Sequence, residues 1–147
     1  MDAPNRRLLA VHALGVLPWN LVGAPGAWTA FLSVGFVNLA PPRNLVTIYD
    51  YVFVFTRGLP EFILAWPLGL VMYIAALGAA IIAVFDLEDP RVTAGLLALF
   101  AVSQAVFARG FASRSGYTVI PIATITAAVV VWWFYWPLVR ESVLGGR

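Results

Sequence analysis

The chain has 147 residues, of which 62% are hydrophobic and 11% are charged, and its formal net charge is +2 at pH 7. A soluble domain is about 45–50% apolar and about 25% charged, so this composition excludes an ordinary soluble domain and predicts an integral membrane protein in contact with the lipid bilayer. The basic residues form no stripe, which argues against a nucleic-acid partner. The lack of cysteine and the single histidine exclude a disulfide, a thiolate nucleophile and a multi-histidine metal site.

The first apolar segment, residues 8–23, predicts the first transmembrane helix. A helix that crosses the hydrocarbon needs about 20 mostly apolar residues, and this segment (LLAVHALGVLPWNLVG) is short and carries His12, Pro18 and Asn20. A second interpretation is a signal peptide, because two arginines precede the segment and the small residues GAPGA follow it. Pro18 and Asn20 are unusual in the apolar part of a signal peptide, which favours the helix.

The longest predicted connection, residues 23–58, follows this helix. Its apolar part, residues 27–40, has only 14 residues, which is too short for a normal span and predicts an interfacial or re-entrant segment. The next piece, LVTIYDYVFVF at residues 45–55, suits an interfacial helix or a short strand. Its aromatic side chains are typical of the lipid headgroup region.

Three further segments are long and apolar enough to span: residues 59–85, 92–111 and 117–139. The last of them ends in WWFYWP, whose aromatic rings are typical of a membrane–water interface. With residues 8–23 they predict an all-α bundle of four transmembrane helices in a single domain, residues 1–147, with an outward loop between the first two helices.

The orientation follows from the arginines that flank the spans. An even number of spans places both termini on the same side of the membrane. Arg6 and Arg7 precede the first span, and positive charge near the first helix often sets orientation. We therefore expect a multi-pass protein of the cytoplasmic membrane with both termini in the cytoplasm and residues 23–58 outside.

A cluster of charges lies where the second span begins: Asp50, Arg57 and Glu61. A structural role is favoured, because buried charges need partners and a carboxylate in the first helical turn meets the positive end of the helix dipole. Thr56 or Gly58 would then cap this helix. The functional alternative is that the three side chains bind a lipid headgroup or a substrate carboxylate.

Three polar residues inside apolar sequence form a second candidate set: His12, Asn20 and Gln104. Polar groups in a membrane are costly, so each is a candidate for function. His12 suits a proton relay because an imidazole ordinarily gains and loses its proton near neutral pH, whereas a lone histidine, asparagine or glutamine more often makes one interhelical hydrogen bond. Gln104, in the middle of its span, is the strongest candidate for such a bond.

Four strings carry a resemblance to a known group: DYVFVFTRGLP, LAWPLG, EDPRVTAGLL and WWFYWP. Together they resemble small haloarchaeal multi-pass membrane proteins of unknown function, some encoded near archaeosortase, the membrane enzyme that processes C-terminal sorting signals. The resemblance covers about residues 6–140. It implies a haloarchaeal membrane and a link with surface-protein processing, but it transfers no catalytic residue. Archaeosortase uses a cysteine nucleophile, which this chain lacks.

No catalytic motif indicates a reaction, so we expect no catalytic residue, metal or cofactor. The leading hypothesis is a small non-enzymatic accessory protein that binds a membrane protein or a second copy of itself, in surface-protein processing or cell-envelope biogenesis. One alternative is an oligomeric transporter or channel with a polar path around Arg57, Glu61 and His12. A weaker alternative is an interfacial enzyme with Asp50 or Glu61 as its base.

Overall fold

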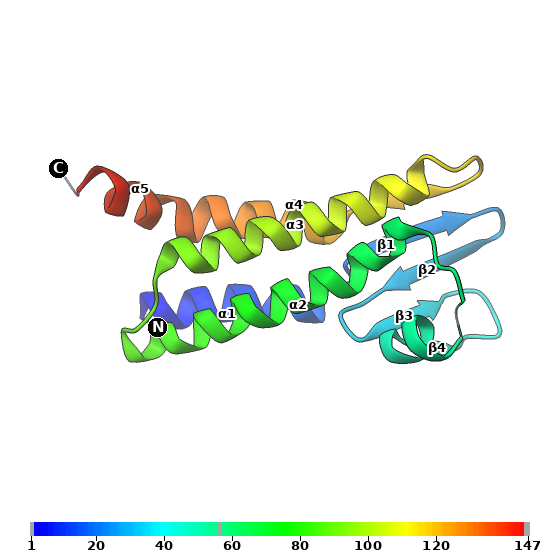
Figure 1. Ribbon diagram of the computed structural model, residues 1–147, viewed down its shortest axis with the longest axis horizontal. Helices are drawn as coiled ribbons and strands as arrows, with labels where there is room; N and C mark the ends of the chain where they lie inside the picture. Colours follow the sequence, from blue (N-terminus) through cyan, green and yellow to red (C-terminus); the bar gives the residue numbers. More distant parts are fainter. Residues whose placement is uncertain (1, 56, 146–147) are drawn as a thin grey trace.

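The computed structural model describes residues 2–55 and 57–145. Its helices lie side by side along the long axis, and a sheet extends from one end of the bundle (Figure 1). The helices are α1 (Ala3–Val16), α2 (Glu61–Ile82), α3 (Pro90–Ala112), α4 (Ile122–Val130) and α5 (Trp136–Leu144). The short helical turns are η1 (Asp50–Val54), η2 (Ala83–Phe85) and η3 (Val131–Tyr135), and η3 joins α4 to α5. The strands are β1 (Asn20–Ala24), β2 (Ala27–Phe31), β3 (Gly35–Asn38), β4 (Leu45–Thr47) and β5 (Thr118–Ile120).

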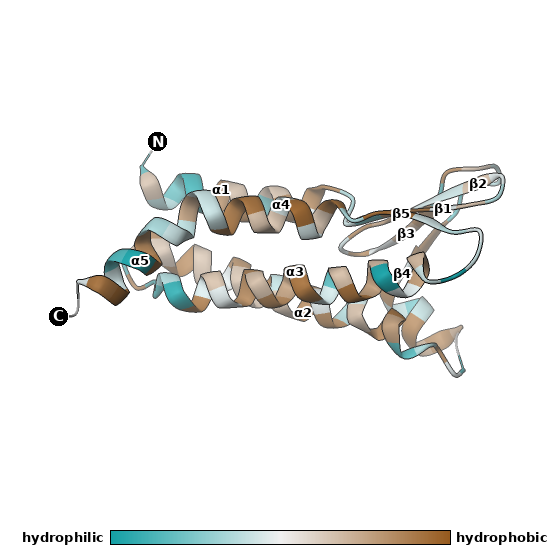
Figure 2. Cartoon of the chain, turned by 90° about the horizontal axis from the view of Figure 1, so that it is seen from above, coloured by the Kyte–Doolittle hydropathy of each residue, from teal (hydrophilic) through white to brown (hydrophobic). Residues whose placement is uncertain are grey.

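Three helical segments of the described chain are long and apolar enough to cross a membrane: Glu61–Phe85, Pro90–Ala112 and Ile122–Leu144. Large apolar side chains point outward on each of them, including Leu68, Val102 and Val129, which are all more than half exposed. Hydrophilic residues gather toward the two ends (Figure 2). Soluble proteins rarely expose so much apolar surface, so this arrangement agrees with a membrane protein.

The length of α3 also matches a bilayer. Arg91 and Arg109 bound a charge-free stretch of α3. At about 1.5 Å per residue this stretch is about 27 Å long, close to the hydrocarbon thickness of about 30 Å. The predicted spans 59–85 and 92–111 are therefore confirmed as long apolar helices, with ends that differ from the prediction by one or two residues.

The predicted bundle of four transmembrane helices is not confirmed, because the first helix is short. α1 has 14 residues and ends at Val16, so it is about 21 Å long and by itself shorter than the hydrocarbon thickness of about 30 Å. Pro18 explains this end, because proline disfavours helical backbone at the residue before it and has no N–H to donate. The rest of the predicted span, from Asn20 onward, forms strand β1.

The connection after α1 forms an antiparallel sheet, where the sequence had predicted an interfacial or re-entrant segment at residues 27–40. Residues 27–31 and 35–38 are strands β2 and β3, and the antiparallel sheet has the strand order β4-β3-β2-β1-β5. Residues 45–55 contain both elements that the sequence allowed, strand β4 and then the short helix η1.

The fourth predicted span, residues 117–139, begins too early. Its first residues form β5, which pairs with β1 and places Val119 opposite Val22. The helix that follows begins at Ile122, after Pro121, and continues through η3 into α5. Both termini lie at the end of the bundle that is opposite the sheet (Figure 1).

Aromatic side chains attach the sheet to the helices. Trp66 of α2 is fully buried, and its ring centroid lies 5.1 Å from that of Phe31 on β2. Phe31 also packs edge-on against Phe107 of α3, at 4.8 Å. The Trp66 indole N–H donates a hydrogen bond to the Leu32 carbonyl at 2.9 Å. A buried tryptophan contributes a large apolar area and needs a partner for its N–H, so this cluster holds the sheet firmly on the bundle.

Candidate functional site

The charges near the start of α2 do not converge. Thr47 Oγ1 donates to the Asp50 carboxylate at 2.8 Å, and the Asp50 N–H donates back to Thr47 Oγ1 at 3.1 Å. Arg57 and Glu61 are exposed. Within residues 2–55 and 57–145, no ion pair joins any two of Asp50, Arg57 and Glu61. The exposed charges of Arg57 and Glu61 need no protein partner, whereas Asp50 is bonded to Thr47.

The cap predicted for α2 also differs from the structure. Pro60 occupies the N-cap position and makes no side-chain cap hydrogen bond. Gly58 has a φ of 74°, which lets the chain turn before the helix. Thr56, the other predicted cap, lies outside the described residues. Glu61 does lie in the first turn of α2, where a carboxylate interacts favourably with the helix dipole.

Aromatic side chains surround this charged region. Tyr49, Phe53 and Phe55 are 64%, 74% and 69% exposed. Tyr51 instead packs edge-on against Phe36 of β3, with ring centroids 5.1 Å apart. Burial raises the pKa of the Tyr51 hydroxyl above its usual value. The element η1 thus presents Tyr51 to the sheet and Phe53 to the surroundings, and the exposed Tyr49 and Phe55 flank it.

Two of the three polar candidates in the apolar sequence meet in the interior. Asn20 Nδ2 on β1 donates to Gln104 Oε1 on α3 at 2.9 Å, and both residues are fully buried. Gly69 on α2 makes room for them, because a Cβ there would lie 2.1 Å from Gln104 Nε2. His12 is exposed on α1, and no side-chain hydrogen bond involves its imidazole within the described part of the chain. The contact of Asn20 with Gln104 ties the sheet to α3.

Replacing Gln104 by leucine is expected to destabilise the protein by about 1–3 kcal/mol, because the Asn20 amide is then buried without a partner. Replacing Asn20 and Gln104 together is expected to cost less than the sum of the single changes. The coupling energy should be about 1 kcal/mol, as for other polar pairs inside membrane proteins. Unfolding in detergent micelles, measured for the four members of the double-mutant cycle, tests this. Additive single changes would contradict it.

A further polar cluster lies at the end of the bundle opposite the sheet. The Arg7 guanidinium on α1 donates to Glu88 Oε2, and Thr93 Oγ1 on α3 donates to Glu88 Oε1 at 2.7 Å. The side chains of Arg7 and Glu88 are only 14% and 4% exposed. The Tyr135 ring lies beside Arg7, with 6.0 Å between the guanidinium carbon and the ring centroid.

The start of α3 positions this cluster. Asp89 caps the helix by accepting a hydrogen bond from the Arg91 N–H at 2.9 Å, and Pro90 occupies the first helical turn. These are favoured residues for a helix start, and they fix Glu88 one position earlier. The sequence shows the helix start in EDPR but not the pairing with Arg7, because the two residues are 81 positions apart.

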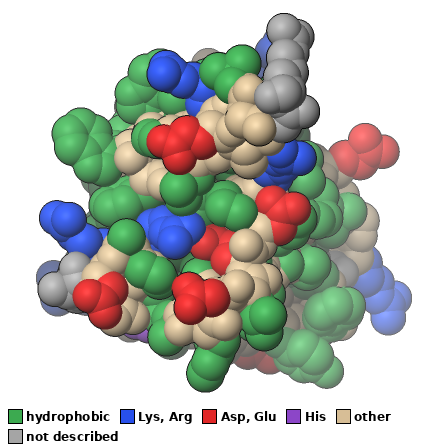
Figure 3. Space-filling model, turned by 90° about the vertical axis from the view of Figure 1, so that its left-hand side faces the viewer, with side chains coloured by type: hydrophobic (Ala, Val, Ile, Leu, Met, Phe, Trp, Pro, Cys, Tyr) green, Lys and Arg blue, Asp and Glu red, His purple; other side chains and the backbone are tan. Residues whose placement is uncertain are grey.

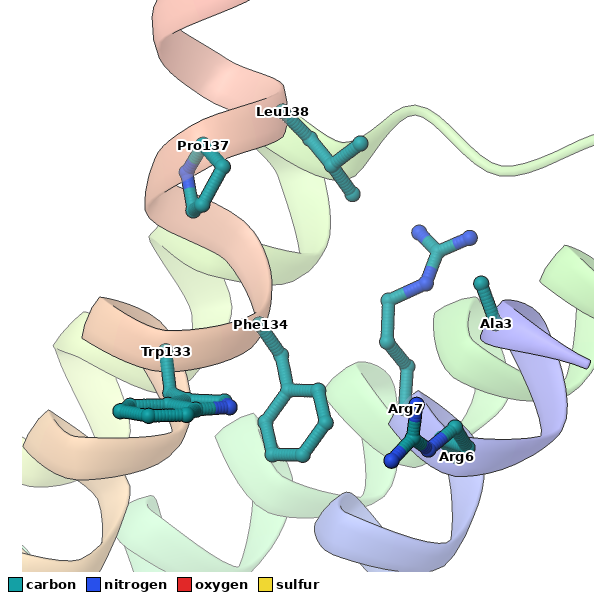
Figure 4. A pocket seen from close by; sticks show the side chains of 7 residues that line it. All are labelled: Ala3, Arg6, Arg7, Trp133, Phe134, Pro137 and Leu138. Carbon is teal, nitrogen blue, oxygen red and sulfur yellow. The ribbon is translucent and has the colours of Figure 1, made fainter.

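A pocket of about 290 Å³ opens beside Arg7, and its lining comes from α1, η3 and α5. The residues that line it are Ala3, Arg6, Arg7, Trp133, Phe134, Pro137 and Leu138 (Figure 4). Figure 3 shows this end of the molecule, where arginine and acidic side chains are interspersed with hydrophobic ones. Arg7 Nε and the Tyr135 hydroxyl are buried and make no hydrogen bond within the described residues.

A comparison with known families assigns the chain to one of them. The family described as "Domain of unknown function (DUF8050)" matches residues 1–144. The chain belongs to this family. No curated protein and no solved structure matches it.

Membership of DUF8050 agrees with the resemblance to an uncharacterised family. The haloarchaeal origin and the link with archaeosortase stay predictions. In this DUF8050 chain, residues 2–55 and 57–145 contain no group of three or more histidine, cysteine, aspartate or glutamate side chains placed to hold a metal ion. The polar contacts described above instead join one element of the fold to another.

Proposed function

We propose that the protein is a non-enzymatic accessory protein of the cytoplasmic membrane that presents its sheet to a membrane-protein partner. The observation that carries the proposal is the open sheet at one end of the bundle. Strand β4 pairs only with β3, and β5 pairs only with β1, so each has one free edge within the described residues. A free edge offers unpaired N–H and C=O groups to an added strand, and exposed side chains such as Leu45 lie along it.

The positions of the charged and polar residues support binding rather than transport. A transport path needs polar groups that line a continuous route. Arg57 and Glu61 are exposed near the sheet, and His12 is exposed on α1. The buried pair Asn20 and Gln104 bond to each other. These contacts favour a rigid scaffold that carries the sheet.

The proposal also assigns an orientation. Arg6 and Arg7 lie in the first half of α1, and α1 begins at the end of the bundle that holds both termini (Figure 1). Positive charge beside the first apolar segment favours the cytoplasmic side, so the sheet faces outward. A partner-binding sheet on the outer face fits a role in surface-protein processing or cell-envelope biogenesis.

Photocrosslinking in cells tests the proposal. A photoreactive residue at Leu45, 58% exposed on β4, should form an adduct with another membrane protein. The matched control is Ile125 on α4, which is also exposed but lies in the apolar segment Ile122–Leu144, away from the sheet edge. Adducts from Leu45 and not from Ile125 would support the proposal. Adducts from neither position, or the same adducts from both, would contradict it.

A further inference from the structure

The pocket beside Arg7 combines a positive charge with an apolar wall. Arg6 is exposed, and within the described residues it makes no ion pair and no side-chain hydrogen bond. The charge of Arg7 is offset by Glu88, which leaves the charge of Arg6 in excess at the pocket. No aspartate or glutamate lines it, and the other lining side chains are apolar. Figure 4 shows Arg6 and Arg7 extending from α1 on one side, and Phe134 and Leu138 facing them from the other.

The pocket lies near the start of α3, where Arg91 ends the charge-free stretch whose length matches the hydrocarbon. Arg91, at the start of α3, donates from Nε to Ser142 Oγ on α5 at 2.8 Å, which places these two charge-bearing helix ends at the same height. Pro137 and Leu138 lie little more than one turn deeper on α5, and Trp132 and Trp136 stack on each other nearby with 6.0 Å between ring centroids. Tryptophan is typical of the membrane–water interface.

We propose that this pocket binds an acidic phospholipid. Arg6 contacts the phosphate, because a guanidinium forms strong charge-assisted hydrogen bonds with phosphate oxygens. Trp133 and Phe134 contact the start of the acyl chains. A zwitterionic lipid brings its own cation close to Arg6, and free phosphate has no apolar part to fill the wall. The charge of Arg6 and the apolar lining of the pocket together therefore favour a ligand that has an anionic headgroup and an apolar tail.

Lipid retention by the purified full chain tests this inference. The protein is reconstituted in nanodiscs of phosphatidylcholine with a minor fraction of phosphatidylglycerol, extracted into mild detergent, and the lipids that stay bound are counted by native mass spectrometry. The wild type should retain phosphatidylglycerol above its fraction in the disc. Arg6→Gln should lower this enrichment about fivefold, the usual effect of one arginine near an anionic membrane surface.

Two further variants make the test specific. Arg140→Gln removes an exposed arginine at the same end but outside the pocket, and it should keep the enrichment. Ala3→Trp fills the pocket and should abolish the retention of phosphatidylglycerol. This variant keeps the inference testable if Arg6→Gln does not fold. Equal retention of the two lipids by the wild type, or equal losses in Arg6→Gln and Arg140→Gln, would overturn the inference. Displacement of the lipid by inorganic phosphate at matched concentration would also overturn it, because phosphate alone would then be the ligand.

Discussion

Glu88→Gln is expected to lower the free energy of unfolding by about 3–5 kcal/mol, because it leaves the Arg7 charge buried without its counterion. Glu88 is 4% exposed and receives hydrogen bonds from both Arg7 and Thr93. The neutral glutamine side chain keeps one acceptor oxygen but carries no negative charge. The effect should appear as a lower midpoint of unfolding in detergent micelles.

Two controls separate charge from packing in this test. Asp89→Asn, in the same loop, keeps an acceptor oxygen for the cap of α3 and should cost less than about 1 kcal/mol, because asparagine caps a helix about as well as aspartate. Replacing Arg7 and Glu88 together by methionine should cost less than Glu88→Gln alone, since no charge is then stranded. Equal losses in Glu88→Gln and Asp89→Asn would show that the ion pair has no special role.

The second large effect is expected at the junction of sheet and helices. Trp66→Ala should destabilise the protein by about 3–5 kcal/mol, because the large cavity left behind cannot close completely. Trp66 is fully buried, packs against Phe31 and donates to the Leu32 carbonyl. The loss of stability should begin at the sheet. Amide hydrogen exchange should therefore accelerate more in β2 and β3 than in α3.

The matched control is Trp66→Phe, which keeps an aromatic ring but loses the indole N–H. This variant should lose the hydrogen bond to the Leu32 carbonyl and some packing contacts. It should accelerate the amide hydrogen exchange of β2 and β3 less than Trp66→Ala does. If Trp66→Ala leaves the exchange of β2 and β3 unchanged, the sheet does not depend on this contact. That result would contradict the packing described for the junction.

The sequence predicted the long helices well and the sheet poorly. The spans beginning at residues 59 and 92 follow from apolar length alone, which the bilayer imposes directly. Strands β1 and β5 lie in apolar runs without strict alternation, and their pairing joins Val22 with Val119, far apart in the chain. Such long-range pairing leaves no local pattern. Pro18 did signal the end of α1, but the apolar residues around it favoured a longer helix.

The residues of the candidate site were likewise predicted only in part. Asn20 and Gln104 were recognised because a polar side chain in apolar sequence is unusual, although their contact with each other was not predicted. Asp50 and Arg57 are close in sequence, yet no ion pair joins them in the described chain. The buried pair of Arg7 with Glu88 was missed, because sequence distance hides it.

Disulfide crosslinking between β1 and β5 tests the account most directly. The natural chain has no cysteine, so any disulfide reports only the introduced pair. Val22→Cys with Val119→Cys places thiols on directly opposite residues, whose Cβ atoms in antiparallel strands are about 4.5–5.5 Å apart. We predict efficient crosslinking of this pair in membranes, and little for Leu21→Cys with Val119→Cys, where the side chains lie on opposite faces. Failure of the first pair, or equal crosslinking of both, would contradict the sheet and with it the proposed binding surface.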